Sequence, residues 1–87
     1  MHEMSLLADL FRKIEAIAMS EEARRITKVK LKLGALAHIS ADHLREHFEE
    51  AAKGTAAEGC QLEIETNADT GDPNAQDILL ESVEVET

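Results

Sequence analysis

The sequence predicts an α+β domain in which two helices pack on one face of a small three-stranded sheet. The predicted order is helix, strand, helix, strand, strand. Apolar residues recur with helical spacing over 5–19 and 40–52. They alternate with polar residues in 26–33 and recur in short strand-like runs at 61–65 and 78–85. A chain of 87 residues is long enough for one core. These observations together predict a single domain.

The first helix is predicted over residues 5–19. Its apolar side chains follow steps of three and four and form one stripe, which comprises Leu7, Leu10, Phe11, Ile14, Ile17 and Ala18. A stripe of this kind is the buried face of an amphipathic helix. The polar run Ser20-Glu21-Glu22 marks its end.

The first strand is predicted over residues 26–33, where the period changes to two. Apolar and basic residues alternate there as Lys28, Val29, Lys30, Leu31, Lys32 and Leu33. Three lysines on one face could indicate a phosphate site. The later strands are expected to place glutamates on the same face, namely Glu63, Glu65, Glu84 and Glu86. Cross-strand ion pairs therefore explain the lysines better.

The second helix has a marked beginning. Ser40 is predicted to cap it, Asp42 suits its positive end, and Ile39 can pack onto Leu44. Gly54 stands at a plausible C′ position, just past the helix end. The inner face is predicted to comprise Leu44, Phe48, Ala51 and Ala52.

The second and third strands are predicted over 61–65 and 78–85, with the loop 67–77 between them. They are close enough in sequence for an antiparallel pairing. The first and second strands are joined through a helix, so a right-handed crossover is expected if they are parallel. In the third strand the apolar residues change parity, which predicts a bulge near Glu81-Ser82.

Composition excludes several classes of function. The formal net charge is −9, from 18 acidic and 9 basic residues, which argues against binding to nucleic acid or anionic membranes. A divalent metal or a cationic partner fits better. The start lacks the pattern of a signal peptide, and no apolar run is long enough to span a membrane, so a cytoplasmic location is expected.

The best candidate for a reactive site is the start of the chain, Met1-His2-Glu3. The α-amino group, the first backbone amide and the imidazole of His2 can close around one metal ion as fused chelate rings. Nitrogen ligands of this kind suit Ni(II) or Cu(II). The alternative is an ordinary histidine near a frayed terminus.

Other candidate sites have a weaker basis. His43 and His47 are four residues apart, so they share one helix face with metal-ligand spacing, but an exposed polar face is the favoured explanation. Asp69 and Asp72 match no EF-hand spacing and are interpreted as part of a loop. Cys60, the one cysteine, is interpreted as a small buried residue and not as a reactive thiol. No spacing specifies a catalytic arrangement, so the protein is not expected to be an enzyme.

Several blocks of sequence resemble the HypA metallochaperones, which help insert nickel into [NiFe]-hydrogenase and, in some organisms, urease. They are Met1-His2-Glu3-Met4-Ser5-Leu6, Val29-x-Leu31-x-Leu33-Gly34-Ala35-Leu36, Phe48-Glu49, Gly54-Thr55, Glu58-Gly59-Cys60-x-Leu62 and Glu81-Ser82-Val83-Glu84-Val85-Glu86. The blocks keep this order and cover nearly the whole chain.

The resemblance implies that the chain delivers Ni(II) during maturation of [NiFe]-hydrogenase. In the family, the N-terminal amine and the residue matching His2 bind nickel, and the residue matching Glu3 contributes beside them. Met1, His2 and Glu3 are therefore the expected metal ligands. The implied partners are a HypB-like maturation GTPase and the hydrogenase large subunit. The alternative is an interaction module that docks the GTPase without carrying nickel itself.

The chain also departs from the family. HypA proteins carry a zinc domain with two Cys-x-x-Cys pairs between the strands that match 61–65 and 78–85, whereas here the short loop 67–77 contains no cysteine. No bound zinc is expected, and residues 1–87 are interpreted as one nickel-binding domain. Either the protein is a natural zinc-less member or the lobe has been removed. Family members usually carry an acidic residue where this chain has Ser40. Oligomeric state is left open.

Overall fold

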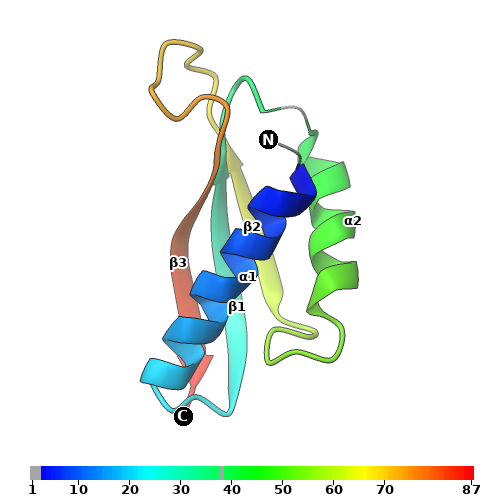
Figure 1. The fold of residues 1–87 in the computed structure, drawn as a ribbon, viewed down its shortest axis with the longest axis vertical. Helices are drawn as coiled ribbons and strands as arrows, with labels where there is room; N and C mark the ends of the chain where they lie inside the picture. Colours follow the sequence, from blue (N-terminus) through cyan, green and yellow to red (C-terminus); the bar gives the residue numbers. More distant parts are fainter. Residues whose placement is uncertain (1–2, 38) are drawn as a thin grey trace.

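The order of helices and strands follows the prediction. The computed structural model describes residues 3–37 and 39–87, and describes side chains from Leu7 on with the exception of residue 38. Its elements are α1 (Glu3–Ser20), β1 (Arg25–Leu33), α2 (Ala41–Ala52), β2 (Gln61–Thr66) and β3 (Ile78–Glu86). The strands form one mixed sheet, and the two helices lie on the same side of it (Figure 1). The predicted α+β class is confirmed.

Strand β1 lies at the centre of the sheet, in the order β2-β1-β3. It is parallel to β2 and antiparallel to β3. The predicted antiparallel pairing of the second and third strands is therefore wrong. The connection from β2 to β3 crosses the end of β1 and is held there, because the Gly34 amide donates to Asp77 and the Leu36 amide donates to Ala75. This course places β3 on the opposite edge from β2.

The predicted bulge in β3 is confirmed. Lys30 pairs with Ser82 while the next residue, Leu31, pairs with Leu80, so Glu81 is the extra residue. The extra residue shifts the alternation of side chains by one position. Val83 and Leu80 can therefore both pack against the core despite their opposite parity.

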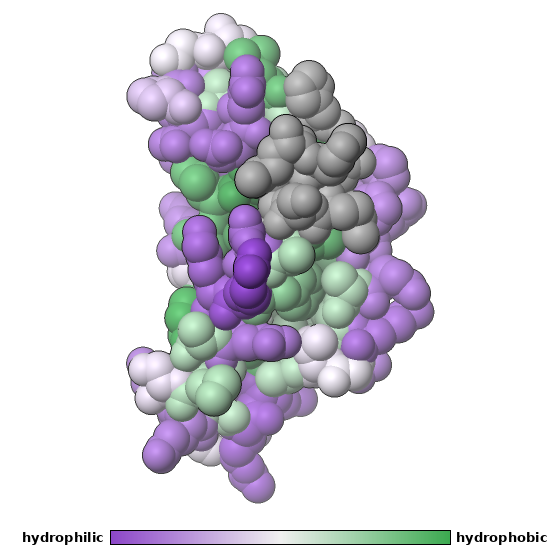
Figure 2. Space-filling view, in the orientation of Figure 1, coloured by the Kyte–Doolittle hydropathy of each residue, from purple (hydrophilic) through white to green (hydrophobic). Residues whose placement is uncertain are grey.

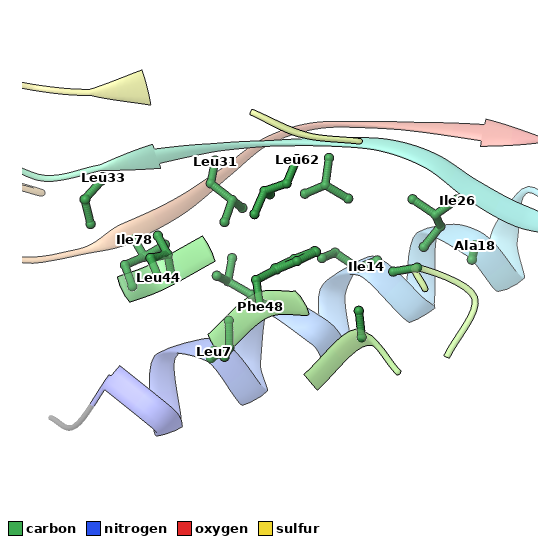
Figure 3. Packing of buried hydrophobic residues seen from close by; sticks show 14 residues of the cluster. Leu7, Ile14, Ala18, Ile26, Leu31, Leu33, Leu44, Phe48, Leu62 and Ile78 are labelled. Carbon is green, nitrogen blue, oxygen red and sulfur yellow. The ribbon is translucent and has the colours of Figure 1, made fainter. Parts of the chain in front are cut away.

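The core lies between the helices and the sheet (Figure 3). Its largest fully buried side chains are Ile14, Ile26, Val29, Leu31, Leu44 and Phe48. The rings of Phe11 and Phe48 join α1 to α2, with centroids 4.9 Å apart. Ala51, predicted to face inward, is exposed, whereas Ala52 is buried. The buried stripe of α2 is narrow and follows steps of four, at Leu44, Phe48 and Ala52.

Two of the three lysines of β1, Lys28 and Lys30, form the expected ion pairs with neighbouring strands. Lys28 Nζ lies 3.1 Å from a carboxylate oxygen of Glu63 and 4.0 Å from one of Glu84. Lys30 Nζ lies 3.9 Å from a carboxylate oxygen of Glu81, the bulge residue, which the alternation alone did not suggest. These groups are solvated, so each pair contributes little to stability.

Within residues 3–37 and 39–87, neither helix combines the length and apolar character that crossing a bilayer requires. Hydrophilic residues cover the outer flank of α2, on the right of Figure 2.

Candidate metal centre

The predicted chelate comes directly before α1. Met1 and His2 lie outside the described residues, as does the side chain of Glu3, whose backbone begins the helix. The helix is anchored one turn later, where Leu7 and Leu10 are 3% and 2% exposed. In Figure 1 the first turns of α1 and α2 lie at the same end of the long axis of the molecule. In the sequence, residues 1–3 thus stand four residues before the first core position of α1, Leu7.

Ser40 begins α2, as predicted. Its backbone has the extended conformation of an N-cap, with φ −79° and ψ 160°. Its Oγ accepts a hydrogen bond of 3.1 Å from the backbone N–H of His43, and its carbonyl accepts one of 2.9 Å from Leu44. Serine therefore supplies the capping oxygen at the position where the family is expected to have a carboxylate.

His43 and His47 meet on the outer face of α2. Their Nε2 atoms are 3.1 Å apart, and their ring centroids are 4.5 Å apart with a tilt of 36°. His43 is exposed and His47 is half-buried. The predicted shared face is confirmed, and the structure adds that the rings touch through their nitrogens. Within the described part of the chain, no three His, Cys, Asp or Glu side chains gather as a metal site.

The carboxylates of the loop 67–77 cap turns. Asp69 Oδ1 accepts from the Gly71 amide at 2.9 Å, and Asp72 Oδ1 accepts from the Asn74 amide at 2.8 Å. The second oxygen of Asp72 accepts from Asn67 Nδ2 at 3.0 Å. Short polar side chains that bond to the backbone two residues on are typical of tight turns. These contacts support the interpretation as a loop.

Cys60 lies half-buried just before β2, packed against the core. Burial raises the pKa of its thiol. The thiol form is therefore favoured over the nucleophilic thiolate. This environment agrees with the predicted role as a small core residue.

Arg45 makes a contact that no sequence pattern marks. Its Nη1 donates a hydrogen bond of 2.9 Å to the backbone carbonyl of Leu62 in β2, an edge strand. Only the tertiary fold brings these two groups together.

The comparisons with known proteins agree on one family. Residues 1–72 match the family model described as "Hydrogenase/urease nickel incorporation, metallochaperone, hypA". Among curated relatives, hydrogenase maturation factor HypA of Chlorobium limicola is 46% identical over 65 residues, which is 75% of this chain and 56% of that protein. The corresponding factor of Desulfitobacterium hafniense is 42% identical over 65 residues, 75% of this chain and 57% of that protein.

The fold also has a counterpart of known structure. The solution structure of the Ni metallochaperone HypA from Helicobacter pylori matches with a TM-score of 0.78 at 16% identity, covering 99% of this chain and 98% of that one. The curated relatives above are longer, and the match spans less than three fifths of their length. The family match over most of the chain decides the assignment: the chain belongs to the HypA family of nickel-incorporation metallochaperones.

Proposed function

We propose that this chain binds Ni(II) and delivers it during the maturation of [NiFe]-hydrogenase. The observation that carries the proposal is the family match over residues 1–72, which includes the Met1-His2-Glu3 sequence. Nickel is the cargo, so transfer proceeds by ligand exchange without covalent catalysis. Membership of a metallochaperone family also supports the absence of an enzymatic role.

The proposed ligands are the amine of Met1, the backbone amide and imidazole of His2, and a backbone or carboxylate oxygen of Glu3. Three nitrogens in fused rings suit Ni(II), which favours nitrogen donors in tetragonal or square geometry. Protons compete for the amine and the imidazole, whose ordinary pKa values are about 7.8 and 6.5. Nickel affinity should therefore fall steadily as the pH is lowered through this range.

A nickel titration of protein with a free N-terminus tests the ligand set. Ligand-field absorption of bound Ni(II) lies at visible wavelengths, where amino-acid side chains do not absorb. The spectrum of an amine–amide–imidazole complex should appear at one nickel per chain. It should disappear after acetylation of the N-terminus and in His2→Ala.

The matched control is His43→Ala, which also removes one imidazole but leaves the three N-terminal residues intact. It should keep the spectrum. Unchanged affinity and spectrum in both the acetylated protein and His2→Ala would refute the proposed ligands.

We further propose that residues 1–87 act as one nickel-binding domain in which the loop 67–77 stands in place of a zinc domain. The loop holds no cysteine, and its two aspartates already cap turns. Structural zinc sites depend on cysteine and histidine ligands. Purified protein should therefore contain no stoichiometric zinc, and a chelator should not change its melting temperature. A tightly bound zinc ion at that loop would contradict this proposal.

The proposed partners are a HypB-like maturation GTPase and the hydrogenase large subunit. A second candidate function is an interaction module that docks the GTPase without carrying nickel. Ser40 favours this alternative, because it replaces an acidic residue expected in the family, as does the lack of cysteine in the loop 67–77. Co-purification with the GTPase separates the two functions. Binding that survives both a chelator and His2→Ala supports the interaction module, whereas strict dependence on nickel supports delivery.

A further inference from the structure

The two histidines of α2 are arranged as a pair of converging donors. The distance between His43 Nε2 and His47 Nε2 is 3.1 Å, and the rings are tilted by 36°. In the metal-free pair, one Nε2–H donates to the other Nε2. If the donating ring carries its proton on Nδ1 instead, both Nε2 lone pairs are free. Small rotations of the rings would then aim both lone pairs at one point in solvent.

The observed separation is the one that a shared metal ion requires. Imidazole nitrogens bind first-row divalent metals such as zinc at about 2.0–2.1 Å. Two such ligands at a right angle lie about 2.9 Å apart, and two at a tetrahedral angle lie about 3.4 Å apart. The 3.1 Å between the two Nε2 atoms falls between these values. The two nitrogens therefore already lie at the spacing of two ligands of one metal ion.

The helix that carries the pair is well fixed. Ser40 caps it through the amide of His43 itself. Leu44 and Phe48, each 1% exposed, anchor its inner face next to the two histidines. Both imidazoles are thus presented from one rigid element, which lowers the entropic cost of binding a metal with both.

The charge around the pair favours a cation. The sequence of α2 contains four carboxylates, at Asp42, Glu46, Glu49 and Glu50, and one Lys or Arg residue, Arg45. The guanidinium of Arg45 is hydrogen-bonded to the Leu62 carbonyl of β2. The net negative charge of the helix raises the local concentration of divalent cations.

We propose that His43 and His47 form a second, solvent-facing site for a first-row divalent metal ion such as Ni(II). Each histidine supplies Nε2, and water completes the coordination. Imidazole suits nickel, copper and zinc. The site uses residues of α2 alone and does not depend on the ligand set proposed at the N-terminus.

The test is a Ni(II) titration of the full chain with an acetylated N-terminus, followed by calorimetry and by NMR of the imidazole resonances. Acetylation removes the α-amino donor of the proposed N-terminal site. Nickel binding that remains is therefore assigned to His43 and His47, and its loss would leave the N-terminal proposal unaffected. Bound Ni(II) is paramagnetic and should broaden the ring signals of His43 and His47 together, at one ion per chain. His43→Ala and His47→Ala should each weaken this binding by about a hundredfold, the lower end of the gain from linking two binding groups.

A matched control keeps the number of histidines but separates the pair. The double variant His47→Ala with Glu50→His places the second imidazole seven residues from His43, about 10 Å along the helix axis. Its nickel affinity should equal that of His47→Ala. Circular dichroism checks that each variant is folded. Equal affinity of the control and the unmutated acetylated chain, or broadening of only one of the two rings, would overturn the proposal.

Discussion

Replacement of Ser40 by alanine is expected to lower the melting temperature, because it removes the N-cap of α2. The change removes only the hydroxyl that accepts the His43 amide at 3.1 Å, because Ser40 is exposed and its carbonyl bond to Leu44 remains. Loss of such a cap costs about 1 kcal/mol. Unfolding entropy is about 2.1 cal/mol/K per residue, so for 87 residues it is near 0.18 kcal/mol/K. The melting temperature should therefore fall by about 5 °C.

Ser40→Asp is the informative companion to this variant. Aspartate caps helices as well as serine does, and its charge suits the positive end of α2. The melting temperature should stay within about 2 °C of the parent, since exposed substitutions that keep the interaction have small effects. Thermal unfolding followed by circular dichroism measures both variants. An unchanged melting temperature in Ser40→Ala, or an equal loss in Ser40→Asp, would refute the capping argument.

Two further predictions concern the sheet and its end. Lys28 holds the pKa of Glu63 below its ordinary value of 4.5, mainly through their hydrogen bond. The stability from this pair is therefore present in full above pH 4.5 and is lost as the pH falls below that value. The difference in melting temperature between the parent and Lys28→Met should accordingly shrink from pH 7 to about pH 3. A constant difference would count against the ion pair. Gly34→Ala would drive a Cβ into the Ala75 carbonyl oxygen, and should lower the free energy of unfolding measured in urea by about 1–3 kcal/mol. Gly71→Ala, whose Cβ would meet its nearest atom at 3.3 Å, is the control and should unfold close to the parent.

Local signals in the sequence were enough to predict most of the fold. Short stretches of chain predict the alternation of buried and less buried residues in β1, the cap at Ser40 and the position of Gly54, whose φ is positive. The bulge at Glu81 was also predictable, because a change of apolar parity within one strand leaves no other way to keep both halves packed.

Features that depend on distant contacts could not be predicted in this way. The apolar pattern of β3 would be the same whether the strand paired antiparallel with β2 or with β1. Only the course of the connecting loop decides which of the two strands it pairs with. Ala51 follows helical spacing but is exposed, because the buried stripe of α2 is narrow and comprises only Leu44, Phe48 and Ala52.

The two candidate metal sites differ in how far the sequence could predict them. The spacing of His43 and His47 predicted a shared face, but the contact of 3.1 Å depends on ring rotations that spacing does not fix. The assignment of Met1, His2 and Glu3 depends on resemblance to the family, and it remains a prediction because Met1, His2 and the Glu3 side chain lie outside the described residues.

The connection between the two edge strands has a consequence for how this fold can accept insertions. The amide of Asn67 donates to the Leu33 carbonyl, and the amide of Gly34 donates to the Asp77 carbonyl. Both ends of the connection are thus fastened to the same end of β1, within one residue of each other along that strand. The entropic cost of closing a loop between fixed ends rises only slowly with its length. A segment of almost any size, including a separately folded module, could be exchanged at this point while the sheet and both helices remain unchanged.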